Sequence, residues 1–228
     1  MKLSRKRFFF IAAMVVFVVL AWPVETWLEY REKQAQRDGS PDAIYLVAGS
    51  IDQDRRIEAL MNFYSNLVSN AGSASAPAHH SSIAPMLVLV GNDRLKSRWS
   101  SEDQANLTRA EWGVKIIRGR IQNSVFSNQL EIVPGKFGGT DGEMEALGNY
   151  LWNHRELKRL VVVTSPFHVR RTLNRLAIYQ PPAVDVGVVT SKAKWTDYAP
   201  WTVLGELFKM GRDLLGLSRV PWLSRRVR

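Results

Sequence analysis

Short apolar runs alternate with amphipathic segments through the central part of the chain. The apolar runs are rich in Val, Ile and Leu, and they lie at residues 43–48, 86–90, 160–164 and 184–189, with weaker extended runs at 114–117 and 130–133. Continuous apolar runs of this length are typical of strands that are buried on both faces of a parallel sheet. Strands that alternate with helices predict an α/β fold with a Rossmann-like, doubly wound, mainly parallel sheet.

The segments between these runs predict the helices. A helix is expected from Arg55 onwards, because apolar residues recur there at helical spacing. Ser101 is expected to cap a helix that continues to Trp112, and a further helix is expected around residues 144–151. The segment 70–85 is rich in Ala, Ser and Pro and predicts a loop.

The N-terminus predicts a membrane anchor. Four basic residues precede an uncharged run at 8–24, and these 17 residues are at the short limit for a membrane-spanning helix. The basic flank places the N-terminus in the cytoplasm. A cleaved signal peptide is the alternative, and both interpretations place the rest of the chain outside the cytoplasm. We therefore divide the chain into an anchor at 1–28, a linker at 29–41, a domain at 42–217 and a basic tail at 218–228.

The overall charge favours an anionic partner. The chain has 31 Lys and Arg residues against 21 Asp and Glu, a net charge of +10, and it has no Cys. The absence of Cys excludes disulfides, thiolate metal sites and a Cys nucleophile. No nucleic-acid-binding motif is evident, so a membrane surface or a phosphorylated ligand is the expected partner. The amphipathic segment 201–217 and the tail allow either packing on the sheet or contact with an anionic membrane.

Polar groups gather in four loops that follow predicted strands. The candidate ligand-binding residues are Gly49, Ser50, Arg55, Gly91, Asn92, Asp93, Thr140, Thr164, Ser165 and Arg171. Parallel strands bring such loops to one edge of the sheet, where ligands bind in this fold class. Arg55 and Arg171 would neutralise an anion, while His168 and Glu143 are the candidate catalytic residues for proton transfer.

Each of these residues also has a purely structural interpretation. Thr140 and Glu143 have the spacing of a helix capping box, Ser165 stands where an N-cap is expected, and His168 fits an exposed helix surface. No Walker loop, no full G-x-G-x-x-G fingerprint and no metal-ligand spacing is present, so no metal site is predicted and the cofactor is left open.

The residues laid out above resemble the YdcF/SanA/ElyC family of bacterial envelope-associated domains. The segment 163–171, Val-Thr-Ser-Pro-Phe-His-Val-Arg-Arg, is similar to the V-T-S-x-x-H-x-x-R-A signature of that family. Residues 42–49 are similar to its first strand, D-A-I-x-V-L-G-G. Residues 56–59, Arg-Ile-Glu-Ala, are similar to its R-x-x-x-A helix start, with one residue fewer between Arg and Ala. Residues 139–143 are similar to its T-x-x-E-A motif, although Met144 replaces the usual alanine.

The resemblance implies a membrane-anchored, extracytoplasmic domain in cell-envelope, peptidoglycan or lipid-carrier metabolism. On this basis we expect a phosphorylated or nucleotide-like ligand, with hydrolysis or transfer of its phosphate as a further step. One family member is associated with S-adenosylmethionine. The alternative is a non-catalytic envelope-integrity factor that binds a lipid carrier or a protein partner.

Overall fold

The computed structural model describes residues 41–48, 52–73, 87–91, 98–121, 130–135, 137, 139–192 and 205. The predicted anchor, linker and basic tail lie outside these residues, as does all of the segment 201–217 except Gly205. Among the described residues, no helix is long and apolar enough to cross a membrane. The described part ends, apart from Gly205, two residues after the last strand.

Five parallel strands form the main sheet of the described chain. They are β1 (Ala43–Leu46), β2 (Leu87–Val90), β5 (Leu130–Ile132), β6 (Arg159–Thr164) and β7 (Asp185–Thr190). Their spatial order is β5-β2-β1-β6-β7, with β1 hydrogen-bonded to both β2 and β6. The prediction of a parallel α/β sheet is therefore confirmed, and each of its strands lies within a residue or two of an apolar run in the sequence.

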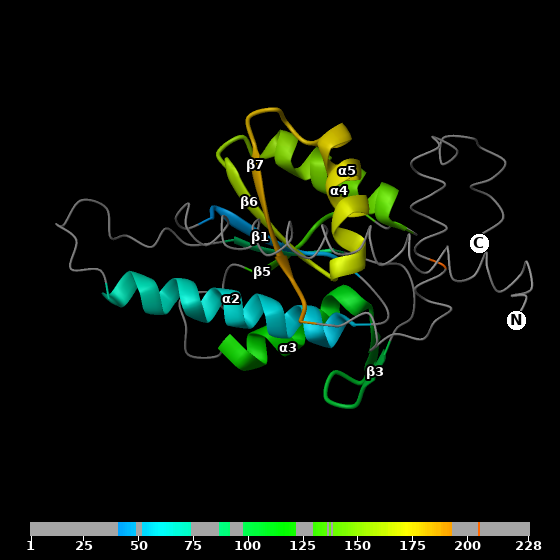
Figure 1. The fold of residues 1–228 in the computed structure, drawn as a ribbon. Helices are drawn as coiled ribbons and strands as arrows, with labels where there is room; N and C mark the ends of the chain where they lie inside the picture. Colours follow the sequence, from blue (N-terminus) through cyan, green and yellow to red (C-terminus); the bar gives the residue numbers. More distant parts are fainter. Residues whose placement is uncertain are drawn as a thin grey trace, which may run out of the picture.

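Helices cover both faces of this sheet (Figure 1). The helices α2 (Gln53–Ser73) and α3 (Arg109–Ile121) pack on one face, and α4 (Thr140–Asn153) and α5 (Val169–Tyr179) pack on the other. Alternate residues of β1 point to opposite faces, because Ile44 lies in the core with α2 and Tyr45 lies in the core with α4. The two cores leave the strands covered on both sides.

The structure corrects three local predictions. Residues 101–112 do not form one helix, because a two-stranded hairpin of β3 (Arg98–Ser100) and β4 (Ala105–Leu107) precedes α3. The run 114–117 is part of α3 and is not a strand. The helix α2 continues to Ser73, so the first residues of the expected loop at 70–85 are helical.

Candidate functional site

The candidate site lies where the order of the strands reverses. The chain moves outward from β1 to β2 and β5, and then crosses back to place β6 on the other side of β1. Such a reversal opens a crevice at the carboxyl ends of the two central strands, and ligands bind there in open α/β sheets. The helices that follow β1, β5 and β6 all begin at this edge, where their first backbone N–H groups have no partner within the helix.

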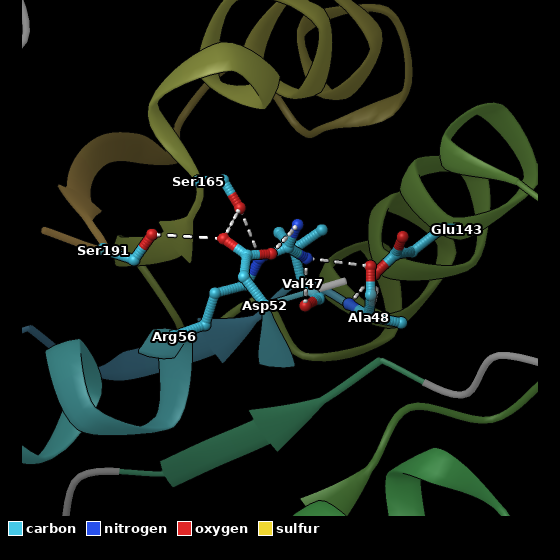
Figure 2. Close-up of polar contacts among 7 residues, drawn as sticks. All are labelled: Val47, Ala48, Asp52, Arg56, Glu143, Ser165 and Ser191. Carbon is cyan, nitrogen blue, oxygen red and sulfur yellow. Dashed lines mark hydrogen bonds and ion pairs between the residues drawn. The ribbon is translucent and has the colours of Figure 1, made fainter. Parts of the chain in front are cut away.

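A buried ion pair spans this edge (Figure 2). Arg56 is 1% exposed and Asp52 is 5% exposed, and Arg56 Nη2 lies 3.1 Å from Asp52 Oδ1 one helical turn away. Arg56 Nη1 also donates to the carbonyl oxygens of Val47 and Ala48, both at 3.0 Å. The guanidinium therefore fixes the turn that leaves β1.

Two serines connect the ion pair to the strands on the other side of the crevice. Ser165, just after β6, donates to Asp52 Oδ2 at 2.5 Å and accepts a hydrogen bond from Arg56 Nε at 2.8 Å. Ser191, just after β7, donates to the same carboxylate oxygen at 3.3 Å. We call Asp52, Arg56, Ser165 and Ser191 the buried polar network. It joins the carboxyl ends of β1, β6 and β7.

This geometry replaces the expected capping role of Ser165. A short 3₁₀ helix, η2 (Pro166–His168), follows β6 with Ser165 in the N-cap position. The Ser165 side chain makes no capping hydrogen bond, because its hydroxyl is directed to Asp52 and Arg56. The fully buried position of Ser165 leaves no room for solvent contact.

Glu143 holds the same turn from the opposite face of the sheet. Its Oε1 accepts hydrogen bonds from the Tyr45 hydroxyl at 2.9 Å and from the Ala48 backbone N–H at 2.6 Å, and the side chain is buried. Both backbone groups of Ala48 are thus bound, the N–H by Glu143 and the carbonyl by Arg56 (Figure 2). Burial, followed by the nearby Glu143 charge and hydrogen bond, raises the pKa of Tyr45 well above its usual value.

The expected capping box is not formed. The helix α4 has Gly139 at its N-cap with no side-chain capping bond, and Thr140 is the first helical residue. The carboxylate of Glu143 points instead to β1, as its contacts with Tyr45 and Ala48 show.

Gly91 completes the packing around Glu143. It is buried directly after β2, and its N–H donates to the Leu46 carbonyl at 3.0 Å. A Cβ at this position would lie 2.4 Å from Glu143 Oε1 and 2.6 Å from the Tyr45 hydroxyl. Glycine is therefore required here by close approach, which is a different role from the ligand contact that the sequence predicts.

The other predicted site residues divide into three groups. Thr164 is fully buried at the end of β6, and its hydroxyl has no hydrogen-bond partner among the described residues. Arg55 is exposed, whereas Arg171 and His168 are half-buried near the start of α5, with the His168 ring centroid 4.5 Å from that of Phe167. The remaining four, Gly49, Ser50, Asn92 and Asp93, lie outside the described residues.

Sequence reasoning missed most of the buried polar network. Three of its four members, Asp52, Arg56 and Ser191, are not among the predicted site residues, which include Arg55 in place of its neighbour Arg56. Tyr45, the partner of Glu143, is also absent from the prediction. The i, i+4 spacing of Asp52 and Arg56 is visible in the sequence and is typical of a helical ion pair. Nothing in the sequence indicates that Ser191, 139 residues from Asp52, completes it.

No group of three or more His, Asp or Glu side chains within the described part of the chain is arranged to hold a metal ion. Comparison with known proteins adds no assignment: no family model, no curated protein and no solved structure matches this chain. The chemistry of the site therefore rests on its own geometry.

Proposed function

We propose that this protein binds a phosphorylated or nucleotide-like anion in the crevice between the carboxyl ends of β1 and β6. One observation carries the proposal: the buried polar network ties together the loops that follow β1, β6 and β7. Such a network reduces the ordering cost of binding, because the described residues that directly follow β1, β6 and β7 are bonded to one another before the ligand arrives.

The surroundings of the crevice favour an anion. The helices α2 and α4 begin at this edge, and the backbone N–H groups in the first turn of a helix bind phosphates. Arg55 and Arg171 lie at the starts of the helices that flank the crevice. In this proposal they contact the ligand, whereas Arg56 holds the protein frame because all three of its nitrogens are already bound to Asp52, Ser165 and the β1 turn.

The cellular setting follows from the N-terminal segment and from the resemblance to the YdcF/SanA/ElyC family. We propose a single-pass protein of the cytoplasmic membrane with its α/β domain outside the cytoplasm. Its ligand would belong to cell-envelope, peptidoglycan or lipid-carrier metabolism. His168, at the start of α5, is the group proposed to move a proton if the phosphate is hydrolysed or transferred.

A ligand screen by thermal shift on the full chain in detergent tests the binding proposal. The panel contains nucleotides, S-adenosylmethionine, sugar nucleotides and short-chain polyprenyl phosphates. A ligand that binds only the folded protein raises its melting temperature by mass action. We expect a rise with at least one phosphorylated compound that is lost in Arg171→Ala and kept in Arg118→Ala, an exposed arginine on α3. No rise with any of them would contradict the proposal.

One observation favours a non-catalytic binding factor as the second candidate. The buried carboxylate of Glu143 is engaged by Tyr45 and Ala48, so it has a structural task that requires no chemistry. The two candidates differ in their need for His168. If the protein acts only by binding, His168→Gln retains function in a complementation assay, whereas Arg171→Ala loses it. If it acts as an acid–base catalyst, both variants lose function while ligand binding by His168→Gln persists.

A further inference from the structure

A groove runs along the outer side of α4, apart from the crevice between β1 and β6. Its volume is about 510 Å³, within the range of small-molecule sites. The segment after β5 forms one side, and α4 from Gly142 to Asn153 forms the other, with His154 at the end. No member of the buried polar network lines it.

Three ring side chains line the groove, namely Phe137, Tyr150 and His154. The rings of Tyr150 and His154 stack with their centroids 4.1 Å apart. Phe137 packs closely against α4, and a Cβ added at Gly142 would lie only 3.1 Å from the Cβ of Phe137. Both stacked rings are held by acidic partners. Tyr150 donates to Glu131 at 2.6 Å, and His154 Nδ1 lies 3.1 Å from Glu156 Oε1. These contacts fix the rings before a ligand binds.

Amide side chains form the wall. Asn149 and Asn153 are one helical turn apart on α4, both are exposed, and both line the groove. An amide both donates and accepts hydrogen bonds. Glu145 lies one helical turn before Asn149 and adds a hydrogen-bond acceptor to the lining. No Lys or Arg is among the described lining residues.

We propose that this groove binds a neutral, polyhydroxylated ligand, specifically an oligosaccharide chain. Hydroxyl groups donate and accept, as the two amides and the carboxylate require, and the apolar face of a sugar ring can pack on the His154 ring, whose side chain is 40% exposed. An anionic ligand would meet the like charge of the Glu145 carboxylate. A purely apolar ligand would make no use of either amide. The proposal does not depend on the anion crevice.

Isothermal titration calorimetry on the full chain tests this proposal with three probes: cellotetraose, maltotetraose and chitotetraose. The detergent must have no sugar headgroup, because such a headgroup would compete. Both amides of the groove are removed in Asn149→Ala/Asn153→Ala, and Asn174→Ala is the matched control, since Asn174 is an exposed amide on α5 outside the groove. Far-UV circular dichroism of each variant verifies that it is folded.

We expect at least one tetrasaccharide to bind the wild type and Asn174→Ala equally. The double variant should bind it at least about tenfold more weakly, because two hydrogen-bonding groups are lost. Arg171→Ala and added inorganic phosphate should leave this binding unchanged, which separates it from the anion crevice. The proposal is overturned if no probe binds at millimolar concentration, if the folded double variant binds as well as the wild type, or if phosphate displaces the saccharide.

Discussion

At the scale of single residues, two adjacent arginines on α2 differ sharply in their burial and hydrogen bonding. Arg56 is buried and bonded through all three nitrogens, while Arg55 is exposed. Replacing Arg56 with Met would leave the Asp52 carboxylate buried without its cation. We expect a loss of about 3–5 kcal/mol in the free energy of unfolding, measured by urea denaturation.

The matched variant Arg55→Met should change this free energy by no more than about 0.5 kcal/mol, since the side chain is at the surface. Arg56→Lys should not restore stability, because an ammonium cannot reproduce the fork of guanidinium hydrogen bonds. Equal stability losses at positions 55 and 56 would show that the buried polar network is not what holds the turn after β1.

A second residue-scale prediction concerns Gly91. A methyl group added there would lie 2.4 Å from Glu143 Oε1, so the carboxylate or the strand must move. We expect Gly91→Ala to destabilise the fold by about 1–3 kcal/mol in urea denaturation. The control is Gly119→Ala in α3, where a Cβ meets nothing within 4 Å. That change should stabilise the helix by up to about 1 kcal/mol, and a loss there equal to that of Gly91→Ala would refute the steric explanation.

At the scale of elements, the Tyr45–Glu143 hydrogen bond joins β1 to α4 and makes their association sensitive to alkali. The fold raises the pKa of Tyr45, whereas a tyrosine in the unfolded chain has a pKa of about 10. This bond therefore contributes its full stability at a pH below the pKa of tyrosine in the unfolded chain. The contribution declines as the pH rises above that pKa.

The variant Tyr45→Phe tests this link. At neutral pH it should lose about 1–3 kcal/mol of stability, because the buried Glu143 carboxylate loses a donor. Above pH 10 the difference in the free energy of unfolding between wild type and variant should decrease by about 1.4 kcal/mol per pH unit. The reason is that only the wild type must keep Tyr45 protonated in the fold. Urea denaturation at pH 8 and at pH 11 measures both effects. A gap that is constant with pH would contradict the assignment.

Element types were predictable from the sequence wherever burial alone decides them. The sequences of β1, β2 and β6 are apolar along most of their length, and α4 has the expected apolar stripe at Met144, Leu147 and Leu151. The prediction failed at residues 101–112, where side-chain contacts decide. There Asp103 accepts from Ser100 at 2.6 Å and Lys115 donates to Ser100 at 3.0 Å, which stabilises a hairpin that no periodicity indicates.

The site was predictable in position but not in its connections. The carboxyl ends of β2, β5 and β6 lie at one edge of the sheet, as the predicted parallel arrangement requires. The hydrogen bonds of Ser165 and Glu143 join residues 109 and 95 positions apart in the chain, and helical or strand spacing predicts neither. The sequence therefore predicts a cap or a ligand contact for Ser165 and a cap or proton transfer for Glu143. In the fold, Glu143 bonds to Ala48 and Ser165 bonds to Arg56.

At the scale of the whole molecule, the two proposed binding regions differ in charge. The crevice between β1 and β6 is flanked by Arg55, His168 and Arg171, whereas the groove beside α4 offers two amides and a carboxylate. Two separate ligands, one anionic and one neutral, are therefore expected, and each region should be titrated on its own.

The N-terminal segment predicts how the chain is oriented in a membrane. The basic flank before residue 8 and the uncharged run at 8–24 predict that the C-terminus lies outside the cytoplasm. We expect an alkaline phosphatase fused after Arg228 to be active and a cytoplasmic reporter at the same position to be silent. Changing Lys2, Arg5, Lys6 and Arg7 to Glu should reduce that phosphatase activity, because the charge difference across the segment is lost.

The same fusion separates an anchor from a cleaved signal peptide. An uncleaved anchor keeps the full-length mass and stays in the membrane pellet after alkaline extraction, because a spanning helix is held by hydrophobic burial and not by surface charge. A cleaved peptide shortens the protein by about 20 residues, as its length range requires, and releases the remainder. If the protein keeps its full length and the cytoplasmic reporter is active, both interpretations are rejected. The proposed location of this domain outside the cytoplasm is then rejected as well.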